Sequence, residues 1–424
     1  MKLLLFFAIL GFSLASVHRV PLKKIPSVRE RMIRNGEWME YRARKEQGRL
    51  TSKAKDGYSQ PIADFDDQAY TMNVAIGTPP QSFEVLLSLN TGDVWVPEVS
   101  CGADNQECQA FGCDLSLFCN VLCPQPSCCD RTHPPSGNTM CRGKEKFNTT
   151  LSSTYNETNI LLEVDFEDGY LFGPVALETI SFAGGSGDDK LRVTGSAACF
   201  ASNVPNFLEF VPADGVFGLG PFASAASKFL SPLDNAINQE LIAPVFSIYL
   251  AFYPEEVDIR GGLITYGSID TDNCADVLLY TPFTSVSSYE YTVQGISAGD
   301  ASFKGSYRTV SESAAVALTL PTNMAEKLIS SLGAARDPVT GLVLINCNAV
   351  NTTPDITIQI AQRKFQINVK NMIFPYTGNQ CILAIDEADS FGFGPDIILG
   401  EPFMRAYCHI FDIGSQKIGF APSK

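Results

Sequence analysis

Histidine is scarce in this sequence: the chain has 424 residues but only three histidines, His18, His133 and His409. A Ser–His–Asp triad needs a histidine beside its nucleophile, so the chain offers little material for that chemistry. Zinc sites draw on clusters of histidine and cysteine ligands, and three scattered histidines support none. We therefore expect neither a metal site nor a cofactor.

A long apolar run is also missing. The first one extends from Leu3 to Leu14, less than the roughly 20 residues of a membrane span, and no later run reaches that length. Residues 1–16 combine one lysine, an apolar stretch and small residues, the pattern of a signal peptide. We expect a secreted, extracellular protein without a membrane span; a lysosomal or gut-lumen location is the alternative.

Charge is sparse and unevenly divided. Charged residues make up 18% of the chain and apolar residues 45%, which favours packed cores over disorder. Residues 18–55 carry a net charge of +8, whereas the chain from Asp56 onward carries −24. An acidic body repels phosphate, so we expect no nucleic-acid partner. The contrast favours docking of the basic leader on the body, unless both are solvated faces.

Cysteine, in contrast, is abundant: eight of the 13 cysteines lie between Cys101 and Cys141. This density is typical of an oxidising compartment, and the lack of periodicity there predicts a disulfide-linked loop. A metal site is disfavoured, since this stretch holds one histidine and two adjacent cysteines. Glycosylation sequons that agree with export lie at Asn148, Asn156 and Asn351.

The rest of the chain predicts a mostly β protein. Runs such as TMNVAIG and SFEVLLSL are β-rich and are separated by turn residues, while helices are expected only near 227–239, near 323–333 and in the leader. The length exceeds a single β core and predicts two lobes. The expected parts are a signal peptide (1–16), a basic propeptide-like leader (17–55), an N-terminal β lobe (56–240) with a cysteine-rich insertion (101–141), and a C-terminal β lobe (241–424).

An ordered set of motifs then suggests a family. IGTPPQSFEVLLSLNTGDVWVP, DGVFGLG, PVFSIYL, GGLITYGSID, LTLP and ILGEPFMRAYCHIFDIGSQKIGFAP follow one another, and the leader contains VHRVPLKK. The set resembles the pepsin-like aspartic proteases of the A1 peptidase family. The resemblance implies the bilobal pepsin-like fold, with an interlobe cleft for extended peptides, one catalytic aspartate per lobe and a hairpin flap. In that chemistry two carboxylates share one proton and act as acid and base.

The sequence departs from the family at both catalytic positions. Aligning NTG with the family's DTG puts Asn90 at the first position, followed by Thr91 and Gly92, with two residues missing before VWVP. Anchoring on LTLP puts Glu312 at the second position, although a one-residue slip would put Ser311 there. An amide cannot exchange a proton near neutral pH, and glutamate is one methylene too long.

Neighbouring positions complete the expected site. Hydroxyl groups that brace the lobes in the family correspond to Thr91 and Ser313, and Asp93 is a remote candidate for a substitute acid. The flap sequence FEDGYLFG puts Phe166 at the family's tyrosine position, near Gly169, with acidic residues 167 and 168 at the tip. The resemblance also implies a Cys347–Cys381 disulfide, and we favour pairing Cys274 with Cys408.

Three functions are compatible with this pattern. A non-catalytic homologue would bind a peptide or protein ligand in the cleft or through the cysteine-rich loop, as a monomer. An aspartic-type endopeptidase with residual or altered proteolysis would work through Glu312. A secreted structural or storage glycoprotein would have no ligand in the cleft. Asn90 alone favours the first function.

Overall fold

The computed structural model describes residues 16–26, 28–41, 70–102, 139–166, 169–182, 191–251, 259–388 and 394–424. The expected signal peptide, most of the cysteine-rich insertion and the acidic flap tip lie outside these residues. Within them the chain is built mainly of strands, which confirms the mostly β, bilobal fold.

The largest sheet has 13 strands in the order β11-β24-β23-β9-β10-β1-β2-β3-β8-β4-β7-β6-β5. Its strands are β1 (His18–Lys24), β2 (Tyr70–Ile76), β3 (Gln81–Ser88), β4 (Val94–Pro97), β5 (Asn156–Phe166), β6 (Gly169–Phe182), β7 (Leu191–Ala201), β8 (Gly215–Gly218), β9 (Val245–Leu250), β10 (Ile259–Tyr266), β11 (Leu279–Pro282), β23 (Tyr407–Asp412) and β24 (Lys417–Pro422). We call β2 to β8 with α4 the first lobe, and β9, β10, β11, β23 and β24 the connecting strands.

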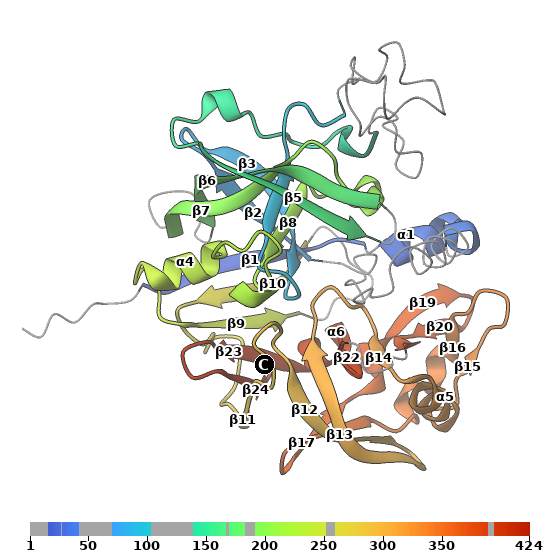
Figure 1. Cartoon of the computed structure of the whole chain (residues 1–424). Coiled ribbons are helices and arrows are strands. Elements are labelled where there is room, and N and C mark those ends of the chain that lie inside the picture. The colour runs from blue at the N-terminus through green and yellow to red at the C-terminus, as the bar shows by residue number, and fades with distance from the viewer. Residues whose placement is uncertain are drawn as a thin grey trace, which may run out of the picture.

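Two further sheets form the second lobe, with orders β18-β17-β12-β13-β22-β14-β21 and β15-β16-β20-β19. Their strands are β12 (Tyr291–Ala298), β13 (Ala301–Ser311), β14 (Leu318–Leu320), β15 (Ala335–Arg336), β16 (Val343–Asn346), β17 (Ile356–Ile360), β18 (Arg363–Ile367), β19 (Ile373–Thr377), β20 (Gln380–Leu383), β21 (Ile385–Glu387) and β22 (Ile397–Leu399). In Figure 1 the first lobe lies above the connecting strands and the second lobe lies beside them, toward the lower right. A division of the chain near residue 240 remains a prediction.

The α-helices α1 (Val28–Asn35), α4 (Pro232–Asn238), α5 (Thr322–Ser331) and α6 (Glu401–Ala406) are short, and residues 38–41 are also helical. The helices expected in the leader, near 227–239 and near 323–333 are therefore confirmed. α4 begins later than expected because Ser231 caps it, accepting a hydrogen bond from Asp234 N, and Pro232 occupies the first turn. No helix among the described ranges is long and apolar enough to cross a bilayer.

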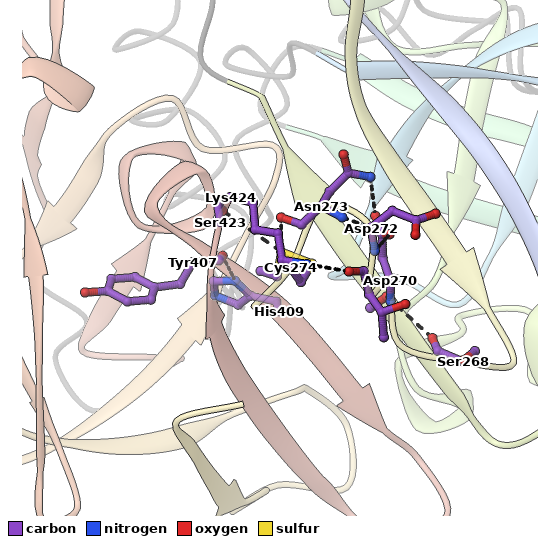
Figure 2. The surroundings of a disulfide bond; sticks show 12 residues. Ser268, Asp270, Asp272, Asn273, Cys274, Tyr407, His409, Ser423 and Lys424 are labelled. Atoms are coloured by element: carbon purple, nitrogen blue, oxygen red, sulfur yellow. Dashed lines mark hydrogen bonds between the residues drawn. A yellow bond between two sulfur atoms is a disulfide. The ribbon is translucent and has the colours of Figure 1, made fainter. Parts of the chain in front are cut away.

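Three disulfides tie the described segments together: Cys101–Cys141, Cys274–Cys408 and Cys347–Cys381. The two pairings expected in the second half of the chain are confirmed. The other six cysteines of the 101–141 stretch lie outside the described residues. Figure 2 shows the Cys274 bond beside the C-terminal residues, where Lys424 N donates to Asn273 O at 2.8 Å.

Candidate functional site

Two loops, one in each lobe, follow the same strand pattern. In the first lobe β3 pairs in parallel with β8, with Leu87 opposite Phe217, and the chain returns on β4 with Val94 opposite Phe217. In the second lobe β13 pairs in parallel with β22, with Ser311 opposite Leu399, and the chain returns on β14 with Leu318 opposite Leu399. The two loops have equal length, so Ser88 and Glu312 occupy equivalent positions.

Two glycines support this equivalence independently. A Cβ on Gly218 would lie 2.3 Å from Thr91 O and 2.5 Å from Asp93 O, and one on Gly400 would lie 2.2 Å from both Ala315 O and Ala317 O. No side chain tolerates such contacts, so each loop folds over a glycine on the neighbouring strand. Thr91 and Ala315 are therefore equivalent. Thr91 lies three residues after Ser88, and Ala315 lies three residues after Glu312, so the two equivalences agree.

A hydrogen bond repeated in the two loops gives the same result. Asn90 N donates to Ser88 Oγ at 3.3 Å, and Ala314 N donates to Glu312 Oε1 at 3.0 Å. In each loop the amide two residues downstream binds the side chain at the strand end. Asn90 thus corresponds to Ala314.

The expectation that Asn90 stands opposite Glu312 is therefore wrong in register, and so is the expected loss of two residues before VWVP. The misalignment arose because NTG resembles DTG locally. The number of residues in the loop is fixed by strand pairing, and a three-residue similarity does not change it. A signal was present in the sequence. Counting back from Trp95 by the family's spacing, DTGSSNLW, reaches Ser88.

Glu312 is held in a buried position. Its side chain belongs to a residue that is 3% exposed, and its Oε1 also lies 3.5 Å from Leu89 N of the first lobe. Its Oε2 is buried without a hydrogen-bond partner among the described residues. Burial raises the pKa of Glu312 to about 7, and the N–H donors of Ala314 and Leu89 oppose this rise only in part.

The residues expected to support the site act within one lobe. Thr91 Oγ1 accepts from Asp93 N at 3.0 Å, and Asp93 accepts from Ala226 N at 2.6 Å and Ser227 N at 3.1 Å. Asp93 therefore anchors a turn of the first lobe. Gly92 packs close to Ala225, whose side chain would lie 3.2 Å from a Cβ on Gly92.

The expected hydroxyl brace between the lobes is not formed by these groups. Ser313 Oγ is buried without a hydrogen-bond partner in the described part of the chain. The first-lobe residue equivalent to Ser313 is Leu89, which has no hydroxyl. The main-chain N–H of Leu89 and the side chain of Glu312 link the two loops instead.

A buried polar chain behind Glu312 was missed by sequence reasoning. Tyr291 OH lies 2.8 Å from Ser311 Oγ, which lies 2.8 Å from Nε2 of His409, and all three residues are buried. Nδ1 of His409 lies 2.9 Å from Tyr407 O, which can only accept, so Nδ1 carries the proton and Nε2 accepts from Ser311. Burial lowers the pKa of His409 to about 3, so the ring is neutral. Residues this far apart in sequence gave no local signal.

The flap hairpin consists of β5 and β6, with Phe166 paired with Gly169 across its described end. The ring of Phe166 packs edge-on against Phe207 with centroids 5.9 Å apart, and Phe207 packs in the same way against Trp95 at 6.3 Å. The flap is thus anchored to the first lobe by apolar contacts.

A two-lobed β protein with equivalent strand-end loops, a hairpin flap and a basic leader is the architecture of one protein class. The sequence profile of the eukaryotic aspartyl proteases matches residues 69–423, and that of the A1 propeptide matches residues 19–45. This chain belongs to the eukaryotic aspartyl protease (A1) family.

Several curated relatives match along their whole length. Aspartic protease 6 of Caenorhabditis elegans is 31% identical over 425 residues, covering 100% of this chain and 99% of the relative. Aspartic protease 2 of Necator americanus is 29% identical over 428 residues, with 100% and 99% covered. Pepsin A of Rhinolophus ferrumequinum is 27% identical over 439 residues, with 100% of both chains covered.

Proposed function

We propose that this protein is a secreted, non-catalytic member of its family in which Ser88 and Glu312 occupy the two catalytic positions. The observation that carries the proposal is the equivalence of these two residues at the ends of β3 and β13. The family's reaction needs a carboxyl group at each position. A serine hydroxyl does not ionise near neutral pH, so Ser88 removes one of the two groups.

The proposed role is binding of an extended peptide or protein segment between the lobes. The fold, the flap and both strand-end loops are retained, while the shared proton of a carboxylate pair is lost. The family's propeptide and its pepsin-like relatives agree with a secreted or lysosomal protein. Asn156 and Asn351 are exposed, as glycan acceptors must be.

Proteolysis through Glu312 alone is the second candidate. The observation in its favour is a buried carboxyl whose pKa is raised to about 7, which suits a general base near neutral pH. In this case Ser88 would have to hold the scissile carbonyl or the water without donating a titratable proton.

Cleavage of a mixed peptide library by the secreted chain, scanned from acid to neutral pH, separates these functions. Pepsin serves as the positive control, and a transition-state inhibitor of aspartic proteases tests the source of any turnover. We expect no inhibitor-sensitive cleavage but saturable binding of a subset of peptides. Inhibitor-sensitive turnover would overturn the proposal, and absence of both turnover and binding would favour a structural or storage glycoprotein.

A further inference from the structure

The leader supplies the strand that joins the two halves of the largest sheet. β1 pairs antiparallel with β10 from His18 opposite Tyr266 to Lys24 opposite Ile259, and it pairs with β2 through Lys23 and Lys24. Among the described strands, β1 alone is hydrogen-bonded to both β10 and β2. Without β1, the connecting strands and the first lobe would each expose a sheet edge there.

Strand β10 has a glycine at the position where it packs against β1. Val20 and Leu22 are buried, and the register shifts next to Leu22 so that Gly261 of β10 faces the leader. A Cβ on Gly261 would lie 2.6 Å from Lys24 Cβ and 3.0 Å from Lys24 N. Because Gly261 has no side chain, the leader can occupy the space beside it.

Beyond the strand, the leader contacts both lobes with arginine and aromatic side chains. Toward the second lobe, Arg29 Nη1 lies 2.6 Å from Asp386 Oδ2, and Trp38 Nε1 donates to Thr340 O at 3.0 Å. The guanidinium of Arg29 also lies 5.6 Å from the ring centre of Trp38, so each holds the other in place.

Toward the first lobe, Arg31 donates to Phe210 O, and the ring of Tyr41 packs edge-on against Phe210 with centroids 6.1 Å apart. Figure 1 shows α1 beside the boundary between the lobes. The same short segment is thus fixed to both lobes.

Apolar side chains of the leader also share a core with the flap hairpin. Ile25, Met32 and Tyr41 are buried in one cluster with Leu162 of β5 and Leu171 of β6. Burying an apolar side chain of this size contributes about 1.5–3 kcal/mol, so release of the leader would expose several such groups at once.

We propose that leader residues 18–41 are a resident ligand that stays bound across both lobes in the secreted protein. An external peptide then binds only if its own arginine and aromatic side chains displace those of the leader. The proposal rests on the proposed function in one respect, since a non-catalytic chain does not cut its own leader.

The first test is the intact mass of the protein secreted by eukaryotic cells. We expect a mass, corrected for glycans, that includes residues 18–41. In the second test, a site-specific protease sequence replaces residues 46–52 of the full chain and is cut after purification. The products are separated by size exclusion at neutral and acid pH, with circular dichroism to confirm that the body is folded.

We expect the cut leader to elute with the body at neutral pH. Arg29→Ala should increase the fraction of released leader several-fold, whereas Arg19→Ala, which removes the same charge from a largely exposed ion pair with Asp272, should have only a small effect. Gly261→Ala should also increase release. Secreted protein that lacks residues 18–41, or complete release of the cut leader from a folded body, would overturn the proposal.

The peptide-cleavage assay, run before and after the cut, keeps the two proposals distinguishable. Turnover that appears after cutting, with the leader still bound, contradicts the proposed function and leaves retention intact. Release of the leader without turnover contradicts retention alone.

Discussion

The main-chain nitrogen of Leu89 in the first lobe lies 3.5 Å from Oε1 of Glu312 in the second lobe. This contact places the end of β3 beside the end of β13, so the two strand-end loops meet across the lobe boundary. Ser88, which precedes Leu89, is the first-lobe residue that strand pairing makes equivalent to Glu312. Four predictions follow from this geometry and from the buried groups around it.

Restoring both carboxyl groups should distinguish Ser88 from Asn90 as the missing catalytic position. We expect Ser88→Asp with Glu312→Asp to yield weak, inhibitor-sensitive peptide cleavage at acid pH. The matched double variant Asn90→Asp with Glu312→Asp should yield none, because Asn90 corresponds to Ala314. Cleavage by the Asn90 double variant but not by the Ser88 double variant would show that Asn90, and not Ser88, is equivalent to Glu312.

The stability of the protein should depend on the ionisation of Glu312. Its raised pKa means that the folded state binds this proton more tightly than the unfolded state, so the contribution of Glu312 to stability falls as pH rises from about 4.5 to about 7. Glu312→Gln, which cannot ionise, should remove this dependence.

Relative to the unmodified chain, we expect Glu312→Gln to gain up to about 3 kcal/mol at neutral pH and little below pH 4.5, where the carboxyl is neutral in both states. Urea unfolding at a series of pH values measures the difference. An equal effect at all pH values would mean that Glu312 titrates normally.

Removing one member of the buried chain of Tyr291, Ser311 and His409 should destabilise the protein more than replacing all three. His409→Phe removes the terminal acceptor and leaves one hydroxyl proton of the Tyr291–Ser311 pair unpaired, so we expect a loss of about 1–3 kcal/mol in the free energy of unfolding. Replacing all three by Phe, Ala and Phe should recover most of this loss, because no polar group is then left unpaired. Urea denaturation of the two variants tests the comparison; equal losses would indicate a packing effect.

Cys199 should be inert in the folded protein. It is the one free cysteine among the described residues, and burial raises the pKa of its thiol well above the ordinary range. We expect no labelling by iodoacetamide at neutral pH until the chain is unfolded, as measured by peptide mass spectrometry. Thr194→Cys, at an exposed position of β7, provides a reactive control; labelling of native Cys199 at a similar rate would contradict its burial.

Much of the fold was predictable because it rests on local patterns. The β runs, the few helices and the two second-half disulfides followed from composition, turn residues and family resemblance. Glu312 follows β13 at the end of the loop that leads to the intact LTLP strand, and its assignment to the second catalytic position stays a prediction. The first-lobe position was misplaced because a three-residue similarity is a weaker constraint than the number of residues between two paired strands.

By itself the sequence determined that this is a two-lobed, mostly β protein of the aspartyl protease family, because the strand patterns, the turn residues and the order of the motifs are properties of the chain alone. The tertiary structure decided which residues face each other. Ser88 became the equivalent of Glu312 through the pairing of β3 with β8, and His409 reached Ser311 across 98 positions through β23. The leader gained its place between β10 and β2 in the same way, because hydrogen bonds between distant strands are not encoded in the spacing of either one.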